Sequence, residues 1–201
     1  MNMKPTAVAL AALLPCLAAS VGDVDKAKTL GNPGAPVRIE IFSDFQCPAC
    51  KAFHETLLPT IIRDYVVPGK VCVISHEFPL PMHPYSREAA IYATAAAHVG
   101  KYQQVADALF KSQGVWGTNG KVWDTVASVL TAAEQKKVQE LSKDQSTLNA
   151  VQQDVTLGQM EKVGQTPTLI LNGKGRSYPF AGPGESNYPI LKSLLDDHFL
   201  K

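Results

Sequence analysis

The sequence predicts an α/β domain that is interrupted by a block of helices. Its patterns indicate a strand–helix–strand unit over residues 37–75, helices over about 84–163, and a further strand pair with a closing helix after residue 168. Two consecutive parallel strands need a crossover connection, so the first unit places its strands side by side with a helix across one face. The later strands then complete a sheet that is flanked by helices.

The first unit is organised around Cys47 and Cys50. Apolar residues over 37–42 predict a buried strand, and those over 53–65 recur at helical spacing. The β-branched run at 71–75 predicts the second strand. Cys47 therefore lies where a strand runs into the N-terminus of a helix.

This position makes the two cysteines a predicted redox pair. Free backbone N–H groups and the helix dipole stabilise an anion at a helix N-terminus, so the Cys47 thiol loses its proton easily. Pro48 suits a first helical turn. The two intervening residues, Pro48 and Ala49, let Cys50 approach within disulfide distance. We interpret Cys47 as the attacking thiol and Cys50 as the resolving thiol.

The C-x-x-C spacing alone also occurs in zinc sites and in structural disulfides. A zinc site needs a second ligand pair, but Cys16 and Cys72 are isolated and the five histidines form no H-x-x-x-H pattern. Redox chemistry without a metal is therefore favoured, and a metal site or an inert disulfide are the alternatives.

The N-terminus has the layout of a secretory signal peptide over residues 1–20. Lys4 precedes the apolar run 7–14, and small residues follow at 18–20, so cleavage is expected between about Ala18 and Gly22. An uncleaved membrane anchor is the alternative, and Pro15 argues against lipidation of Cys16. A signal peptide predicts a periplasmic or secreted protein, in an oxidising compartment.

The composition and the Gly- and Pro-rich segments indicate the domain organisation. The 201 residues are 45% hydrophobic and 18% charged with a net charge of +1, as for one soluble domain, and give no argument for binding nucleic acid. We expect residues 21–36, rich in Gly and Pro near their end, to be an exposed lead-in, and residues 37–201 to form the domain.

Helical patterns fill the block between about residues 84 and 163. They are expected over Ser86–Val99, Tyr102–Lys111, Val122–Leu130, a segment opened by the Thr131–Glu134 capping box, and Leu148–Val163. In the last, Val151, Val155, Leu157 and Met160 are expected to contact the core. Beyond the block we expect a strand at Thr168–Leu171, a turn at Asn172-Gly173, a returning strand at Tyr178–Ala181 and a helix at Tyr188–Phe199.

Two motifs on either side of this block resemble one family. Phe42-Ser43-Asp44-Phe45-Gln46-Cys47-Pro48-Ala49-Cys50 and Gly164-Gln165-Thr166-Pro167-Thr168 are similar to those of the DsbA-like branch of the thioredoxin superfamily, which are secreted bacterial thiol–disulfide oxidoreductases. The resemblance implies a thioredoxin fold, a central mixed β-sheet flanked by helices, with an inserted helical subdomain.

The resemblance also implies roles for individual residues. Cys47 is expected to be the exposed nucleophile and Cys50 the buried resolving thiol. Pro167 is expected in the cis form, with Thr166 before it offering backbone pairing to a substrate strand. Phe45, with Phe78, is expected to add an apolar surface that binds unfolded substrates.

The sequence departs from this family in two places. Ala49 stands where the best-known oxidases carry a histidine, and Thr166 is typical of the isomerase and reductase relatives. Both differences predict a Cys47 thiolate that is less stabilised, and a disulfide that is less oxidising, than in those oxidases.

The second departure concerns a buried acid. Ile41 stands where many relatives carry the acid that takes the resolving thiol's proton, and Glu40 faces the other side of the strand. Glu77 and His83 are weak candidates to replace it. We expect His54 to be a packing or surface residue and Cys72 to be a small buried hydrophobe.

We therefore predict a secreted thiol–disulfide oxidoreductase that acts without a dissociable cofactor or metal. Oxidation in the DsbA-like manner is favoured, a disulfide isomerase or reductase kept reduced by a membrane electron donor is the alternative, and a peptide-binding chaperone or metal carrier is the alternative of another class. The expected partners are unfolded or cysteine-containing secreted proteins and a DsbB-like or VKOR-like membrane redox protein. We expect a monomer.

Overall fold

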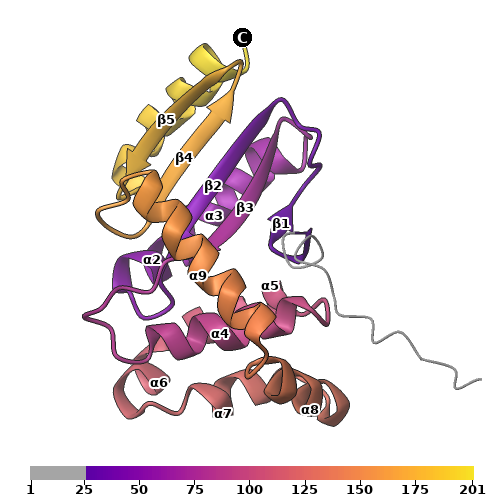
Figure 1. Cartoon of the computed structure of the whole chain (residues 1–201). Helices are drawn as coiled ribbons and strands as arrows, with labels where there is room; N and C mark the ends of the chain where they lie inside the picture. Colours follow the sequence, from indigo (N-terminus) through magenta and orange to yellow (C-terminus); the bar gives the residue numbers. More distant parts are fainter. Residues whose placement is uncertain (1–25) are drawn as a thin grey trace, which may run out of the picture.

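A computed structural model describes residues 26–201 of the chain (Figure 1). The predicted signal peptide, its cleavage site and Cys16 lie outside the described residues. Among the residues that are described, no helix is both long and apolar enough to cross a bilayer.

The centre of the molecule is a mixed five-stranded sheet in the order β1-β3-β2-β4-β5. The strands are β1 (Thr29–Leu30), β2 (Val37–Ser43), β3 (Val71–Glu77), β4 (Thr168–Gly173) and β5 (Arg176–Ala181). β2 and β3 are parallel, as the strand–helix–strand unit predicts, and the other neighbours are antiparallel. The predicted thioredoxin fold with a helical insertion is confirmed.

The connection from β2 to β3 is one nearly continuous helical segment. It comprises α2 (Pro48–Ala52), η1 (Phe53–Leu57), α3 (Leu58–Ile61) and η2 (Ile62–Val66), where η1 and η2 have π-helical turns. Its buried side chains, such as Phe53, Leu57 and Ile61, pack on alternate sheet residues such as Ile39 and Val73. The C-terminal helices α10 (Tyr188–Ser193) and η4 (Leu194–Phe199), preceded by the short η3 (Glu185–Asn187), cover the same face.

The helical insertion lies at one end of the sheet (Figure 1). It comprises α4 (Ser86–Ala97), α5 (Tyr102–Lys111), α6 (Gln113–Asn119), α7 (Val122–Ala127), α8 (Ala132–Leu141) and α9 (Gln145–Met160). The predicted capping box at Thr131 is present and begins α8. Trp116 is fully buried in this subdomain, as a packing residue should be, and the same core includes Phe45, Cys47 and Cys50.

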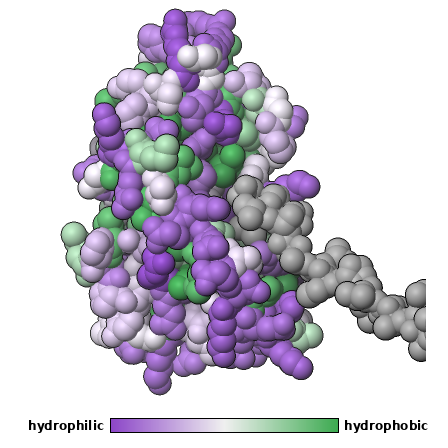
Figure 2. Space-filling view, in the orientation of Figure 1, coloured by the Kyte–Doolittle hydropathy of each residue, from purple (hydrophilic) through white to green (hydrophobic). Residues whose placement is uncertain are grey.

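Helix α9 leaves the insertion and crosses the second face of the sheet (Figure 1). There Val155 and Leu157 pack against Phe42, Phe78 and Ile170. Figure 2 views the molecule from this side, where hydrophilic residues predominate and hydrophobic ones gather in small separate patches. The cluster between α9 and the sheet contains only a few buried side chains, so this face of the sheet carries a small apolar core.

Three local expectations were wrong. The residues before β2 are not simply an exposed lead-in, because Lys28 is 2% exposed and β1 pairs with β3. The hairpin turn is at Lys174-Gly175 rather than Asn172-Gly173, since Asn172 is still paired with Ser177. Met160 is 74% exposed, because it lies at the last turn of α9 rather than inside a helix that continues to Val163.

Candidate active site

Cys47 is the N-cap residue of α2, as the sequence predicts. Strand β2 ends at Ser43, and a turn closed by the hydrogen bond from the Cys47 N–H to the Asp44 carbonyl (3.1 Å) leads into the helix. Cys47 has extended backbone angles and Pro48 follows it in the first turn. The thiol thus lies beside the free N–H groups of the helix N-terminus.

The two thiols are free and differ in accessibility. Cys50 is fully buried, whereas Cys47 keeps 7% of its surface exposed. Cys47 is therefore less exposed than we expected for a nucleophile, because Phe45 and the helical insertion pack around the turn. It is still the more accessible of the pair.

Stabilisation of the Cys47 thiolate lowers the pKa of this thiol to about 5. The largest cause is a hydrogen bond from the Cys50 side chain, and burial opposes it. The Thr166 side chain and the backbone N–H groups of Cys50 and Ala49 add further stabilisation. Ala49 thus acts through its backbone, since its methyl group cannot donate a hydrogen bond.

The pKa of Cys50 is shifted in the opposite direction. Burial raises it strongly, and the neighbouring Cys47 adds to this rise. Two interactions partly oppose this rise in the pKa of Cys50. They are a hydrogen bond with the Ser43 side chain and the Asp44 N–H, which donates to the Cys50 Sγ at 3.4 Å. At neutral pH, Cys47 is a thiolate and Cys50 is a thiol.

The loop before β4 brings Thr166 and Pro167 to the cysteines. The Thr166–Pro167 peptide bond is cis, as expected. The Thr166 carbonyl lies 3.4 Å from the Cys47 Sγ, although the two residues are 119 positions apart. The antiparallel pairing of β2 with β4 explains this contact, because it sets the start of β4 beside the end of β2. The Pro167 carbonyl is already paired with the Gly182 N–H at 2.9 Å.

Two aromatic residues do not form the apolar surface that we expected. Phe45 is 3% exposed and its ring packs on Phe110, while Phe78 is 9% exposed against Phe42. Both are core residues because the helical insertion and α9 cover them. His54 also stacks on Phe110, which confirms its packing role.

Asp44 is a site residue that the sequence analysis missed. Its carboxylate is buried and accepts hydrogen bonds from the Gln46 N–H (2.7 Å), the Leu80 N–H (2.8 Å), His83 Nδ1 (2.8 Å) and the Ser86 hydroxyl (2.5 Å). It therefore ties the cysteine loop to the loop before α4. The only sequence signal is its place three residues before Cys47, since its partners Leu80, His83 and Ser86 lie about 40 residues away.

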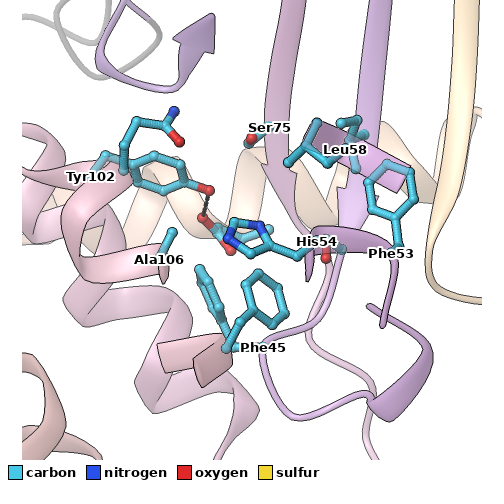
Figure 3. Close-up of a pocket in the computed structure, with 12 residues that line it drawn as sticks. Phe45, Phe53, His54, Leu58, Ser75, Tyr102 and Ala106 are labelled. Atoms are coloured by element: carbon cyan, nitrogen blue, oxygen red, sulfur yellow. Dashed lines mark hydrogen bonds between the residues drawn. The ribbon is translucent and has the colours of Figure 1, made fainter. Parts of the chain in front are cut away.

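Glu77 lies on the cysteine side of the sheet. It is paired with Ser43 in the β2–β3 register, and both residues line a cavity of about 30 Å³. Figure 3 shows the Tyr102 hydroxyl directed at a carboxylate in this cavity, and that bond to Glu77 Oε1 is 2.7 Å long. Burial raises the pKa of Glu77 to about 7. His83, the other candidate, is instead bonded to Asp44.

The cavity suits a small number of water molecules. Its volume is enough for about two waters, which need polar partners. Ser43, Glu77 and Gln103 line it, and the Gln103 Nε2 atom is buried without a hydrogen-bond partner in the described part of the chain. Across residues 26–201, no three His, Cys, Asp or Glu side chains gather as a metal site would require.

The chain is similar to known proteins in its sequence and in its fold. A family model described as Thioredoxin matches residues 23–184. Probable disulfide bond formation protein D of Bacillus anthracis is 27% identical over 186 residues, which cover 87% of this chain and 79% of that protein. Disulfide bond formation protein D of Bacillus subtilis is also 27% identical, over 154 residues that cover 72% of this chain and 67% of that protein.

A solved structure with the same fold is that of Wolbachia pipientis alpha-DsbA1. It superposes with a TM-score of 0.68 at 21% sequence identity, and the match covers 86% of this chain and 90% of that chain. At this identity the likeness concerns the fold, including the helical insertion.

Proposed function

Because this chain belongs to the thioredoxin family and is a DsbA-like thiol–disulfide oxidoreductase, we propose that it forms disulfide bonds in other proteins with its Cys47–Cys50 pair. The observation that carries the proposal is the difference between the two thiols. Cys47 is a thiolate with a pKa of about 5 that keeps a small exposed surface, and Cys50 is a fully buried thiol beside it. One sulfur can be attacked and released easily, and the other is protected.

The reaction starts from the oxidised pair. A substrate thiolate attacks the Cys47 Sγ, the Cys47–Cys50 bond breaks, and Cys50 receives its electron pair and a proton. A second substrate thiolate then attacks the substrate sulfur of the mixed disulfide, and Cys47 leaves as a thiolate. The substrate has lost two electrons and the pair has gained them, so no dissociable cofactor is required.

The stability of the Cys47 thiolate supports the oxidising direction of electron flow. Thiol pKa values are about 3.5 in DsbA and about 7 in thioredoxin, so a value of about 5 lies between an oxidant and a reductant. A stabilised thiolate favours the reduced enzyme and makes its disulfide oxidising. The isomerase or reductase is the second candidate, and the methyl side chain of Ala49 favours it because it gives the thiolate no hydrogen bond.

We assign Glu77 as the group that exchanges a proton with Cys50. It faces Ser43, which is hydrogen-bonded to Cys50, and a water in the shared cavity can bridge the remaining gap. With a pKa of about 7, Glu77 can both donate and accept near neutral pH. In the oxidising direction it protonates Cys50 as the disulfide opens.

Substrates of this enzyme are cysteine-containing proteins that have not yet folded. The cis Thr166–Pro167 loop lies beside Cys47 and is the surface on which an extended chain can pair. We further propose that the protein acts outside the cytoplasm after cleavage of residues 1–20, and that a membrane redox protein reoxidises it. N-terminal sequencing of the extracytoplasmic protein tests the cleavage, with a start between residues 19 and 22 expected.

Refolding of a reduced, unfolded substrate protein tests the activity. The wild-type protein is expected to restore the substrate's disulfides, and Cys47→Ser to be inactive. Cys50→Ser should instead accumulate a mixed disulfide with the substrate, because the resolving thiol is missing. A double Cys47→Ser, Cys50→Ser variant that still promotes refolding would show a chaperone rather than an oxidoreductase.

A further inference from the structure

Lys28 lies between two carboxylates, those of the buried Glu77 and of the largely buried Asp154. Its Nζ atom is 2.8 Å from Asp154 Oδ2 and 3.7 Å from Glu77 Oε1. The side chains of Lys28, Glu77 and Asp154 are 3%, 2% and 13% exposed. Solvent therefore screens these charges weakly.

Three distant segments meet at this cluster. Lys28 directly precedes β1, Glu77 ends β3, and Asp154 lies in α9. The Asp154 carboxylate also accepts the Glu77 backbone N–H at 3.0 Å and His76 Nδ1 at 2.7 Å. These bonds fix Asp154 against the end of β3, next to Glu77 but outside the cavity that Glu77 and Ser43 line.

The two neighbours act on Glu77 with opposite signs. The Lys28 ammonium lowers the pKa of Glu77, and the Asp154 carboxylate raises it, while burial is the largest cause of its rise to about 7. Asp154 holds Lys28 with the shorter contact. One lysine shared by two carboxylates neutralises neither of them fully. Glu77, which has the longer contact, is the carboxylate whose pKa lies near neutral pH.

We propose that Lys28 and Asp154 are positioning residues that set the ionisation of Glu77 in opposite directions, and so fix the pH range in which Cys50 exchanges its proton. This rests on the proposed function of the Cys47–Cys50 pair. During reoxidation the Cys50 proton passes to the Glu77 carboxylate, the Cys50 sulfur attacks the Cys47 Sγ of a mixed disulfide, and the second thiolate leaves.

Several other titratable groups face Glu77 and remain unchanged in the test. Those that act on it or share its cavity are Tyr102 from α5, His76 from β3 and His54 from η1. Cys50 lies beyond Ser43. Because they are common to all variants, a difference between the variants reports the charge that was removed.

Two measurements on the reduced, full-length protein test the proposal. A carbon-13 NMR titration of the Glu77 carboxyl reports its ionisation without any turnover. The rate of reoxidation by oxidised glutathione reports the attack of Cys50 on the mixed disulfide. Both are expected to share one inflection near pH 7 in the wild type, and Glu77→Gln should remove it from the rate profile.

The two charge variants are expected to shift the pH inflections in opposite directions. Lys28→Met should move both inflections up by about one pH unit or more, because the stabilising cation is lost. Asp154→Asn should move both down, because the repelling carboxylate is lost and Lys28 can turn to Glu77. Matched surface variants, Lys137→Met and Asp124→Asn, should leave both unchanged. A merely structural role would shift the two charge variants in the same direction or not at all.

The measurements distinguish a failure of this proposal from a failure of the proposed function. If the NMR inflections do not move in opposite directions, or if Glu77→Gln keeps the inflection in the rate, the proposal is overturned although the enzyme still exchanges disulfides. If the wild type does not react with oxidised glutathione, the proposed function fails, and the NMR titration still decides whether Lys28 and Asp154 control Glu77.

Discussion

At the scale of single residues, the chemistry depends on the unequal surroundings of two identical thiols. Both cysteines pack in the core of the insertion, but helix N-terminal N–H groups and the Thr166 loop act on Cys47, whereas Cys50 is fully buried. The Thr166 hydroxyl is buried and has no hydrogen-bond partner of good geometry among the described residues. It is therefore left to interact with the Cys47 sulfur.

Thr166→Val is expected to raise the pKa of Cys47 by about one unit. A hydrogen bond to a charged group contributes about 1.5–3 kcal/mol, and valine keeps the shape but removes the donor. The absorbance of the thiolate against pH measures this shift. Thr94→Val is the control, because its buried hydroxyl is also unpaired among the described residues but does not act on Cys47. An unchanged Cys47 titration in Thr166→Val would contradict the assignment.

The stability of the reduced protein should depend on pH through Cys47. Its pKa in the folded state, about 5, lies below the ordinary value of 9.0 for a thiol, so the thiolate stabilises the fold fully above pH 9 and this contribution is lost as the pH falls through 5. Between pH 8 and pH 5 we expect a loss of about 3 kcal/mol. Urea unfolding of the reduced wild type and of Cys47→Ser measures it, and equal losses in both would refute the prediction.

At the scale of elements, the helical insertion supports the cysteine loop directly. The Gln113 side chain, at the start of α6, donates to the Phe45 carbonyl at 2.7 Å and to the Cys47 carbonyl at 3.0 Å. Asp44 makes the second link, to the loop before α4. The insertion therefore holds the turn in which Cys47 lies.

Gln113→Leu is expected to destabilise the protein by about 1–3 kcal/mol, because the buried Phe45 carbonyl loses its donor. The matched control is Gln104→Leu, in the neighbouring helix α5, which removes an exposed hydrogen bond to the Val129 carbonyl. Urea unfolding midpoints of the two variants make the comparison. The prediction fails if Gln113→Leu is no less stable than the control.

Sequence patterns predicted most elements because their signals are local. Alternating apolar residues indicate β2, and the Thr131 capping box indicates the start of α8. The exposed lead-in was wrong because the burial of Lys28 depends on Asp154, which is 126 residues away. The roles of Asp44 and Glu77 likewise depend on which strands and loops become neighbours, so no short-range pattern reveals them.

At the scale of the whole molecule, the sheet brings the functional groups together from four parts of the chain. Cys47 follows β2, Glu77 ends β3, Thr166 precedes β4, and Asp154 comes from the helix that closes the insertion. The β2–β3 and β2–β4 pairings place three of these at one end of the sheet. The C-x-x-C motif and the Thr166-Pro167 motif were predictable, whereas their electrostatic environment required the assembled fold.

The reduction potential of the Cys47–Cys50 pair tests the central claim most directly. Equilibration of the mature domain with glutathione buffers measures it, and a Cys72→Ser variant excludes the third thiol. A thiolate stabilised to a pKa of about 5 predicts a potential between about −180 and −120 mV, in the range of oxidising enzymes. A potential near −270 mV, as in thioredoxin, would contradict disulfide formation and make the protein a reductant.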